Sequence, residues 1–574
     1  MMPMPLGRAP STPPWPLFRS VWLFCLAVFP AVSAIWLVPG FVTQDGPAHI
    51  YNAHILRESV RLGEESPFAS AFEARWRPLP NLGGHLTLMG MLTVVSPRDA
   101  DRAMTTITFA AFALAIVWLR VRVAGRVGLG PAVLLSVVLA INMPWLMGFA
   151  NFLVGATLAL ITWGIWWGWR DRLILSRIAA IGGLLVLGYL GHLVSLGITA
   201  GGLVVLAGMA PGTSRERETR MGRTLASCVP LIPLALLYKS LATEGGAFEP
   251  TWEQTGPFWS PVVWVKRLSW VDPITLGRRD FVPLWPELQG RWCVLLAPSF
   301  WLGLGLAILI GNHFNQWRSG ETATLMNDRR PWAVLAALLL LGGMIGPDGF
   351  GDDHGYFLSQ RVVLLGLACL VPALDLDLRS IAVRLATVLI TVALVSQSAF
   401  VWDYAIEADR RVSPIMKAAP EIGPGARVGT LLIDIRGRYR SNPVLHADCL
   451  LGLGSDNILW SNYETRHYYF PVQVRSEIDA PPSNLFEEVA ILDDAGDLDR
   501  RALLWRDLLQ TYGSAIDVVL AWGSDPMLEA ITADWAGQGP DFRSGMVQIF
   551  RRSKATARRD RTSLIEKASR NRSP

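Results

Sequence analysis

Length, composition and charge together exclude an ordinary soluble enzyme. The chain has 574 residues, of which 51% are hydrophobic and only 17% are charged, which is more apolar than soluble domains usually are. Apolar runs of about 16 to 23 residues recur from Val21 to Trp402, close to the roughly 20 residues that a helix needs to cross a bilayer. We therefore predict a polytopic α-helical membrane protein with about eleven membrane-spanning helices in residues 21–402.

The net charge of +5 does not describe a basic binding face. The stretch from Arg551 to Pro574 carries nine Lys or Arg against two acids, so the rest of the chain is slightly acidic. Nucleic-acid binding requires basic side chains gathered on a folded surface, and we expect no nucleic-acid partner. Residues 553–574 are predicted to form a basic disordered tail that is solvated or touches lipid.

The N-terminal segment, residues 1–20, is predicted to be cytoplasmic. The apolar run that follows lacks a small-residue cleavage site, which favours an uncleaved signal anchor. The five cysteines show neither a disulfide framework nor a zinc-binding spacing.

The orientation of the chain depends on the run from Leu79 to Val95. Asn81 and His85 dilute its first half, so we predict a helix lying at the interface rather than a span, since poorly formed helix ends are unfavourable in lipid. The loops after alternate spans then carry arginines on one side only: Arg120, Arg122, Arg126, Arg170, Arg172, Arg177, Arg215, Arg217, Arg220, Arg223, Arg318, Arg329, Arg330 and Arg379. Positive-inside bias places these loops and the N-terminus in the cytoplasm, and it places the first outer loop (40–102) and all residues after Trp402 outside.

The first outer loop contains the segment TQDGPAH, in which Asp45 precedes Pro47 at the start of a predicted helix. Asp45 could serve only as an N-cap. His49 follows four residues later, so a carboxylate and an imidazole could also share one edge of the outer face, where an Asp can act as a general base or bind a metal together with imidazole.

Two further polar residues are expected where spans meet the outer face. These are Asn151 in GFANFLVG and His192 in YLGHLVSLG. Polar groups at membrane depth are unfavourable when they face lipid, so each is predicted either to hydrogen-bond between helices or to belong to a site.

The loop PDGFGDDHGYFLSQR gathers Asp352, Asp353, His354 and Arg361. The Asp-Asp-His cluster could bind a divalent cation through oxygen and nitrogen, or it could form a solvated glycine-rich turn. Arg361 opens an apolar span, where its guanidinium could clamp a phosphate or extend to the lipid headgroups.

After Trp402 the pattern changes to that of a small α/β domain, predicted over residues 403–552. ARVGTLLID, AIDVVLAWG and GMVQIFRR read as strands, and residues 442–453 and PMLEAITADWAG read as helices. The segment NILWSNYETRHYYFPVQVR is rich in Tyr, Trp, His and Arg, which is typical of carbohydrate-contacting surfaces and equally of packing against the membrane domain. The predicted α/β domain contains no phosphate-binding loop and no Ser-His-Asp signature.

This layout resembles the GT-C superfamily of membrane glycosyltransferases, in particular bacterial members similar to dolichyl-phosphate-mannose and aminoarabinose transferases. The segments that carry the resemblance are TQDGPAH, RPLPNLGGHLTLMG, WLRVRVAGR, GFANFLVGATLAL and YLGHLVSLG. The resemblance implies that Asp45 is the catalytic base and His49 its neighbouring helper. It also implies that Arg361 contacts a lipid phosphate. The motif of the superfamily often has two adjacent acids, whereas Gln44 and Gly46 flank Asp45 here.

The leading hypothesis is a plasma-membrane enzyme of bacteria that moves a sugar from a polyprenyl-phosphate donor to an envelope glycan, lipid or protein on the outer face. Asn151, His192, His354 and Arg361 would contact the substrates, and a divalent cation is a possible cofactor. A transporter or flippase of lipid-linked glycans is the second hypothesis, although no internal repeat of the kind found in transporters is apparent. A non-catalytic envelope assembly protein is the third.

Overall fold

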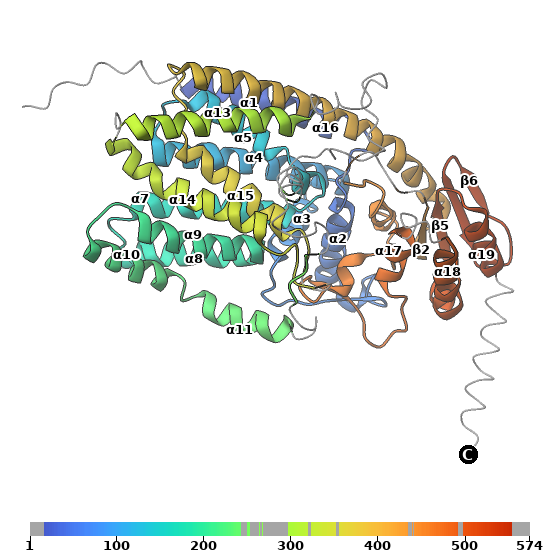
Figure 1. Cartoon of the computed structure of the whole chain (residues 1–574). Helices are drawn as coiled ribbons and strands as arrows, with labels where there is room; N and C mark the ends of the chain where they lie inside the picture. Colours follow the sequence, from blue (N-terminus) through green and yellow to red (C-terminus); the bar gives the residue numbers. More distant parts are fainter. Residues whose placement is uncertain are drawn as a thin grey trace, which may run out of the picture.

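The computed structural model describes residues 17–242, 249–252, 263, 267, 297–319, 323–351, 355–433, 435, 439, 441–491 and 498–553. A bundle of long helices forms one end of the molecule, and a small mixed sheet with flanking helices forms the other (Figure 1). The segment that follows the first helix lies between the two ends. Residues from the first loop and from the C-terminal region, which are far apart in sequence, therefore lie close together in the middle of the molecule.

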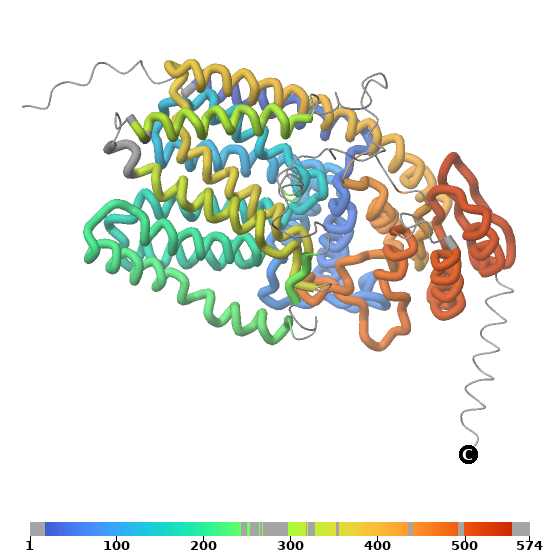
Figure 2. The backbone as a smooth tube through the Cα atoms, in the orientation of Figure 1, coloured from blue at the N-terminus to red at the C-terminus, as the bar shows by residue number. Residues whose placement is uncertain are grey.

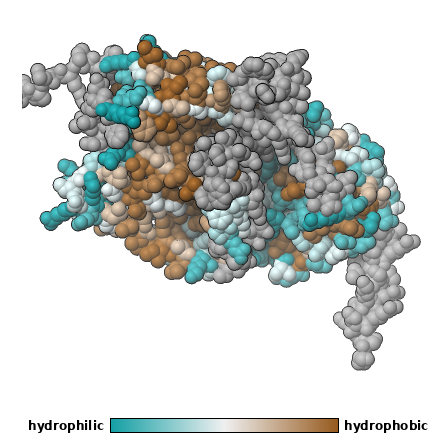
Figure 3. All heavy atoms as spheres, in the orientation of Figure 1, coloured by the Kyte–Doolittle hydropathy of each residue, from teal (hydrophilic) through white to brown (hydrophobic). Residues whose placement is uncertain are grey.

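The helical bundle draws on most of the first 400 residues. Its helices are α1 (Leu17–Leu37), α4 (Pro97–Ala124), α5 (Leu129–Ala140), α7 (Ala150–Trp169), α8 (Leu175–Gly191), α9 (Leu193–Met209), α10 (Ser214–Ser227), α11 (Leu231–Ala242), α13 (Pro298–Ser319), α14 (Ala323–Ile345), α15 (Leu358–Ala373) and α16 (Ile381–Ile422). One continuous apolar core runs through them. Figure 3 shows apolar side chains over the outside of the bundle as well, with hydrophilic ones at its far end and over the C-terminal region. So large an apolar surface would be unfavourable in water, and the bundle is the membrane-embedded part.

Helix length and composition identify four described helices that can cross a membrane, namely α1, α4, α7 and α16. The pair α10 and α11, bent by 50°, would be a fifth, and four shorter apolar helices accompany them. A helical protein with several membrane-spanning helices is therefore confirmed. The number of eleven spans stays a prediction.

The first loop folds into its own short elements. These are α2 (Gly46–Leu62), the 3₁₀ turn η1 (Gly63–Glu65), β1 (Phe72–Ala74) and α3 (Leu82–Met91). At 1.5 Å per residue, the 10 residues of α3 extend about 15 Å, roughly half of the hydrocarbon thickness. The run from Leu79 to Val95 therefore contains a helix too short to cross the membrane, as expected for a helix at the interface.

The C-terminal region contains a five-stranded sheet of order β3-β2-β5-β7-β6. The strands are β2 (Arg427–Leu432), β3 (Ile458–Leu459), β5 (Val518–Trp522), β6 (Phe542–Ser544) and β7 (Val547–Arg551). β2 is parallel to β3 and β5, whereas β7 is antiparallel to β5 and β6. The remaining elements are α17 (Ser483–Ile491), α18 (Leu498–Tyr512), α19 (Pro526–Ala536) and the 3₁₀ turns η5 (Ala447–Gly452), η6 (Tyr463–Arg466) and η8 (Gly513–Ala515).

Strands β2, β5 and β7 and helix α19 lie where the sequence predicted them, but the helix predicted over residues 442–453 is wrong. Only the short turn η5 forms there. Its Asp448 accepts hydrogen bonds from Thr430 and Ser461, and Gly452 packs so closely on Tyr51 that a Cβ would come within 2.1 Å of the ring. Side-chain bonds and tight packing outweigh the local pattern, as is common for weak helix signals.

Helix α16 is 42 residues long and runs from the bundle to the sheet, as the tube in Figure 2 shows. Its second half packs Val412, Ile415 and Ala418 into the apolar core of the C-terminal region. The predicted domain boundary between 402 and 403 therefore falls inside one continuous helix.

The first loop and the C-terminal region are joined by main-chain and side-chain bonds. β1 pairs antiparallel with β4 (Val472–Val474). The hydroxyl of Tyr51 donates to the carbonyl of Asn457 at 2.7 Å and accepts from the amide of Leu459 at 3.2 Å. Because these groups are buried, the bonds fix the C-terminal region over the start of the first loop.

Candidate active site

A cavity of about 230 Å³ lies where the bundle, the first loop and the C-terminal region meet. Its polar lining includes Gln44, Asp45, His49, Asn151, His192, Arg361, His446, Tyr463, Arg466 and Glu487. Aromatic and aliphatic side chains such as Met147, Phe149, Phe152 and Leu193 complete the bundle side. A mostly apolar cleft with a few convergent polar groups is the usual form of a small-molecule site.

Asp45 immediately precedes α2, yet its side chain makes no capping bond. Thr43 takes that role, since its hydroxyl accepts the hydrogen bond of the Gly46 amide at 3.2 Å. The Asp45 amide donates to the carbonyl of Met147 at 3.0 Å. Gly148 permits this close approach, because its φ is +82° and a Cβ there would come within 3.1 Å of the Asp45 nitrogen. The carboxylate is thus free to line the cavity.

Burial dominates the electrostatics of Asp45, which is only 7% exposed. Burial raises its pKa to about 7, against the opposing effect of His49. Its polar neighbours include the Gln44 amide, 3.4 Å from Oδ1, and the Nε2 atom of His446, 3.7 Å from Oδ1. Burial lowers the pKa of His446 to about 3, so this imidazole is neutral. A carboxyl group with a pKa near neutrality is suited to proton transfer.

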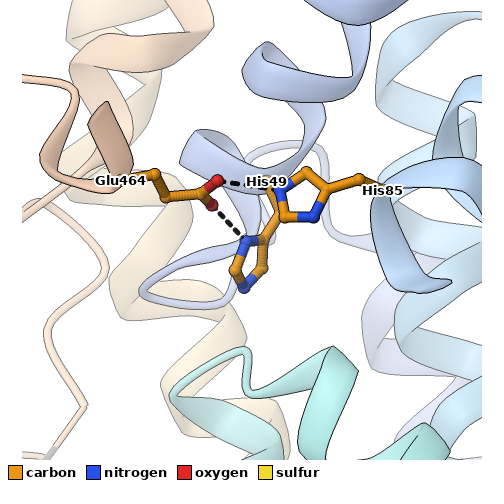
Figure 4. Close-up of side chains that lie close together, drawn as sticks. All are labelled: His49, His85 and Glu464. Carbon is orange, nitrogen blue, oxygen red and sulfur yellow. Dashed lines mark hydrogen bonds and ion pairs between the residues drawn. The ribbon is translucent and has the colours of Figure 1, made fainter. Parts of the chain in front are cut away.

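His49 points toward Glu464 of η6, which belongs to the aromatic segment 457–475 (Figure 4). Nδ1 of His49 meets one carboxylate oxygen, and Nε2 of His85 lies 2.8 Å from the other. Burial alone would raise the pKa of Glu464, but the two imidazoles hold it at about 2. The ligand atoms of this group lie within 4.8 Å of one another, so among the described residues it could hold a metal ion.

His192 and Arg361 meet on the bundle side of the cavity. Nη1 of Arg361 donates to Nε2 of His192 at 3.2 Å, and the guanidinium lies 4.8 Å from the ring centre of Phe149 and 5.6 Å from that of Phe152. Arg361 Nε and His192 Nδ1 are buried without a hydrogen-bond partner among the described residues. Buried donors of this kind are costly to leave unpaired, and an anion in the cavity would pair them.

Asn151 also lines the cavity, and its side chain holds two elements together. Its carbonyl oxygen accepts the Gly84 amide at 2.8 Å, which ties α7 to α3. Both of the roles that the sequence left open for Asn151 are thus compatible with its position. Asp352, Asp353 and His354 lie outside the described residues.

Sequence reasoning proposed Asp45, His49, His192 and Arg361, which all line the cavity, but it did not point to several residues around them. Glu464 and His85 form the buried cluster with His49. His446 approaches Asp45. The aromatic composition of segment 457–475 was a signal for this region, and Glu464 is the only acid within it. No local spacing, however, connects Glu464 to the two histidines.

No protein-family model matches the sequence, and no curated protein matches it. Among solved structures, the chain is similar to ArnT from Cupriavidus metallidurans in the apo state, with 10% identity and a TM-score of 0.53 over 94% of this chain and 99% of that chain. ArnT bound to undecaprenyl phosphate matches with the same identity and TM-score over 95% and 99%.

The archaeal oligosaccharyltransferase AglB from Archaeoglobus fulgidus, in complex with an inhibitory peptide and a dolichol-phosphate, has 11% identity and a TM-score of 0.45 over 88% of this chain and 69% of that chain. The likeness to ArnT over nearly the whole of both chains shows the fold. The chain has the fold of the GT-C membrane glycosyltransferases, as the sequence resemblance implied.

Proposed function

We propose that the protein is a membrane glycosyltransferase that moves a sugar from a polyprenyl-phosphate donor to a cell-envelope acceptor, with Asp45 as the base. The observation that carries the proposal is that Asp45 and Arg361 line one cavity, although they are far apart in sequence. ArnT, whose fold the chain shares, has been solved with undecaprenyl phosphate bound. A base and a fixed cation across one cleft are the two groups that this transfer needs.

The proposed reaction begins at Asp45. An acceptor hydroxyl loses its proton to the ionised carboxylate while its oxygen bonds to the anomeric carbon of the donor sugar. The bond between that carbon and the phosphate oxygen breaks, and the phosphate leaves with the electron pair. Burial supports this role for Asp45, since a pKa raised to about 7 makes the carboxylate a stronger base than an exposed Asp.

Arg361 and His192 are proposed to receive the negative charge of the leaving phosphate. The guanidinium lies over two aromatic rings, and no carboxylate pairs with it among the described residues. Its unpaired Nε and the unpaired Nδ1 of His192 are donors that phosphate oxygens would accept. The apolar residues beside them, Phe149, Phe152 and Leu193, suit the first isoprene units of the lipid.

The proposal also assigns roles to further residues and an orientation to the chain. His49 assists at the base, and Asn151 and His354 join His192 and Arg361 in substrate contacts. Asp352 and Asp353 remain candidates for a cation. The arginine-rich helix α10 lies at the end of the bundle opposite the sheet (Figure 1), which supports a C-terminal α/β domain on the outer side of a bacterial inner membrane and a cytoplasmic N-terminus. The eleven spans stay part of the proposal.

The envelope composition of a host strain that depends on the protein tests the proposal. Lipids and glycans are compared by mass spectrometry in cells that carry the wild type, Asp45→Asn or Asp456→Asn. Asp456 is an acid at the same junction, paired with His54 at 3.2 Å, and it does not line the cavity. Asp45→Asn should remove the sugar addition that the wild type makes, and Asp456→Asn should keep it. Unchanged glycosylation in the Asp45 variant would leave a flippase or an assembly protein as the better account.

A further inference from the structure

The buried cluster of His49, His85 and Glu464 joins two separate parts of the chain. His49 comes from α2 and His85 from α3, both in the first loop, whereas Glu464 comes from η6 in the C-terminal region (Figure 4). Glu464 is 0% exposed, His85 is 1% exposed and His49 is 6% exposed. The proposed transfer reaction does not use His85 or Glu464. The cluster therefore needs an explanation of its own.

The two ring nitrogens of His85 contact different groups, and these contacts determine which nitrogen carries the proton of the neutral ring. Its Nδ1 lies 3.0 Å from the main-chain carbonyl of Asn81, which only accepts, so Nδ1 carries a proton. In the neutral ring, Nε2 then presents a lone pair, and this atom lies 2.8 Å from a carboxylate oxygen. Two lone pairs at this distance repel each other, so the contact needs either a proton on Nε2 or a metal ion shared by the two atoms. A backbone carbonyl that orients the second nitrogen is also the usual support of a metal-bound histidine.

The charge around His49 favours a positive charge at the cluster. Asp45 and Asp101 act on His49 together with Glu464, and all three acids are less than a tenth exposed. The guanidinium of Arg102, next in sequence to Asp101, donates its hydrogen bonds to the carbonyls of Val38 and Pro39, and its charge acts on Asp101 from nearby. A buried carboxylate is unfavourable unless positive charge compensates it, and no Lys or Arg of the described residues forms an ion pair with Glu464.

We propose that His49, His85 and Glu464 bind a transition-metal ion of the Zn²⁺ class. Two imidazoles and one carboxylate suit Zn²⁺ better than Mg²⁺ or Ca²⁺, which take oxygen ligands. Ligand atoms around one tetrahedral Zn²⁺ lie about 3.3 Å apart, and the ligand atoms here all lie within 4.8 Å of one another. Small movements of the three side chains bring them into position.

The metal has a defined place next to the cavity, because His49 lines the cavity wall and the other two ligands lie behind it. It links the C-terminal region to both helices of the first loop at a point four residues from Asp45. The bound ion would thus hold the first loop, which carries Asp45, against the segment 457–475. Metal binding does not require that the protein transfers sugar, so the two proposals can fail separately.

Zn²⁺ binding to the purified full-length protein tests the inference. Metal content is measured by mass spectrometry after dialysis, and affinity is measured by competition with a chromophoric chelator. The wild type should bind one Zn²⁺ per chain, and Glu464→Gln and His85→Gln should each weaken binding at least tenfold. The matched control is His54→Gln, in the same helix α2, whose ring nitrogens already face Asp456 and Arg57. This control should bind Zn²⁺ like the wild type.

Thermal unfolding separates loss of the metal from loss of the fold. Added Zn²⁺ should raise the melting temperature of the wild type and of His54→Gln, and it should leave that of Glu464→Gln unchanged. The inference is overturned if the wild type binds no more Zn²⁺ than Glu464→Gln. It is equally overturned if His54→Gln loses as much affinity as His85→Gln, or if Mg²⁺ binds the cluster and Zn²⁺ does not.

Discussion

The wall that the helical bundle contributes to the cavity differs in charge from the wall that the first loop and the C-terminal region contribute. The bundle wall carries Arg361, His192 and aromatic rings, and its described lining contains no acid. The opposite wall carries Asp45, several imidazoles and an ion pair between Arg466 and Glu487 at 3.2 Å. The bundle wall therefore offers a guanidinium that no described carboxylate pairs, whereas the guanidinium of the other wall is paired with Glu487 and its Asp45 has a pKa near neutrality.

This difference explains how one cavity can treat two substrates differently. An anionic lipid phosphate is favoured beside Arg361 and disfavoured beside Asp45, whereas a neutral hydroxyl is tolerated on either side. The phosphate and the acceptor are thus sorted to opposite walls. The predictions below test whether each wall has its own task.

Substitution of Asp45 should have the largest effect. Asp45→Asn keeps the size and the buried position of the side chain but cannot accept the acceptor proton, so transfer should fall by about 100-fold to 10,000-fold. Rates are measured in proteoliposomes with a panel of undecaprenyl-phosphate-linked sugars, by the release of undecaprenyl phosphate. Asp456→Asn, at the same junction but outside the cavity, should be within twofold of the wild type. A similar loss in both variants would show that Asp45 has no special task.

Arg361→Gln should weaken binding of undecaprenyl phosphate by about 10-fold to 100-fold, because hydrogen bonds to a charged group contribute roughly 1.5–3 kcal/mol. Affinity is measured on the full-length protein in nanodiscs. Arg384→Gln, on the exposed face of α16, serves as the matched control and should bind normally. Equal losses in both variants would mean that bulk positive charge, rather than the cavity, attracts the lipid.

The pH dependence of transfer should follow Asp45. Burial raises its pKa to about 7, and the base must be ionised to act. The rate should therefore fall about tenfold for each pH unit below about 6 and level off above about 8. The measurement uses chelator-treated protein, so that no bound cation adds charge near Asp45. A rate that stays flat between pH 5 and 8 would exclude Asp45 as the titrating base.

The junction between the two regions should respond more modestly. Tyr51→Phe removes a buried hydroxyl that bonds both Asn457 and Leu459, which should lower the free energy of unfolding by about 1–3 kcal/mol. Chemical or thermal unfolding in detergent measures the change. The half-buried Tyr512 of α18 gives the control Tyr512→Phe, expected within about 0.5 kcal/mol of the wild type. Equal stability of both variants would show that the junction is not held through Tyr51.

Much of the bundle could be predicted because membrane helices need long apolar runs, whatever they pack against. The same physics marked His192 and Arg361, since polar groups at span ends must face a wet or protein interior. Asp45 was identified from its place before Pro47 and from the resemblance, and the structure shows that Thr43 makes the capping bond that Asp45 could have made.

The rest could not be predicted because it depends on contacts between distant parts of the chain. Glu464 lies 415 positions after His49 and 379 after His85, so no motif spacing connects them. The turn η5 replaced a predicted helix because Thr430 and Ser461 bond to Asp448. The continuation of α16 to Ile422 depends on the apolar core of the C-terminal region, which holds its second half.

The most direct test of two walls with two tasks is to measure lipid binding and sugar transfer on the same preparations of Asp45→Asn and Arg361→Gln. Asp45→Asn should bind undecaprenyl phosphate at least as tightly as the wild type and should not transfer the sugar of a bound donor in a single turnover. Arg361→Gln should lose affinity for the lipid phosphate. The account is wrong if Asp45→Asn transfers the bound sugar at the wild-type rate, or if Arg361→Gln binds the lipid normally. In either case the base would not be Asp45, or the phosphate would not bind at Arg361.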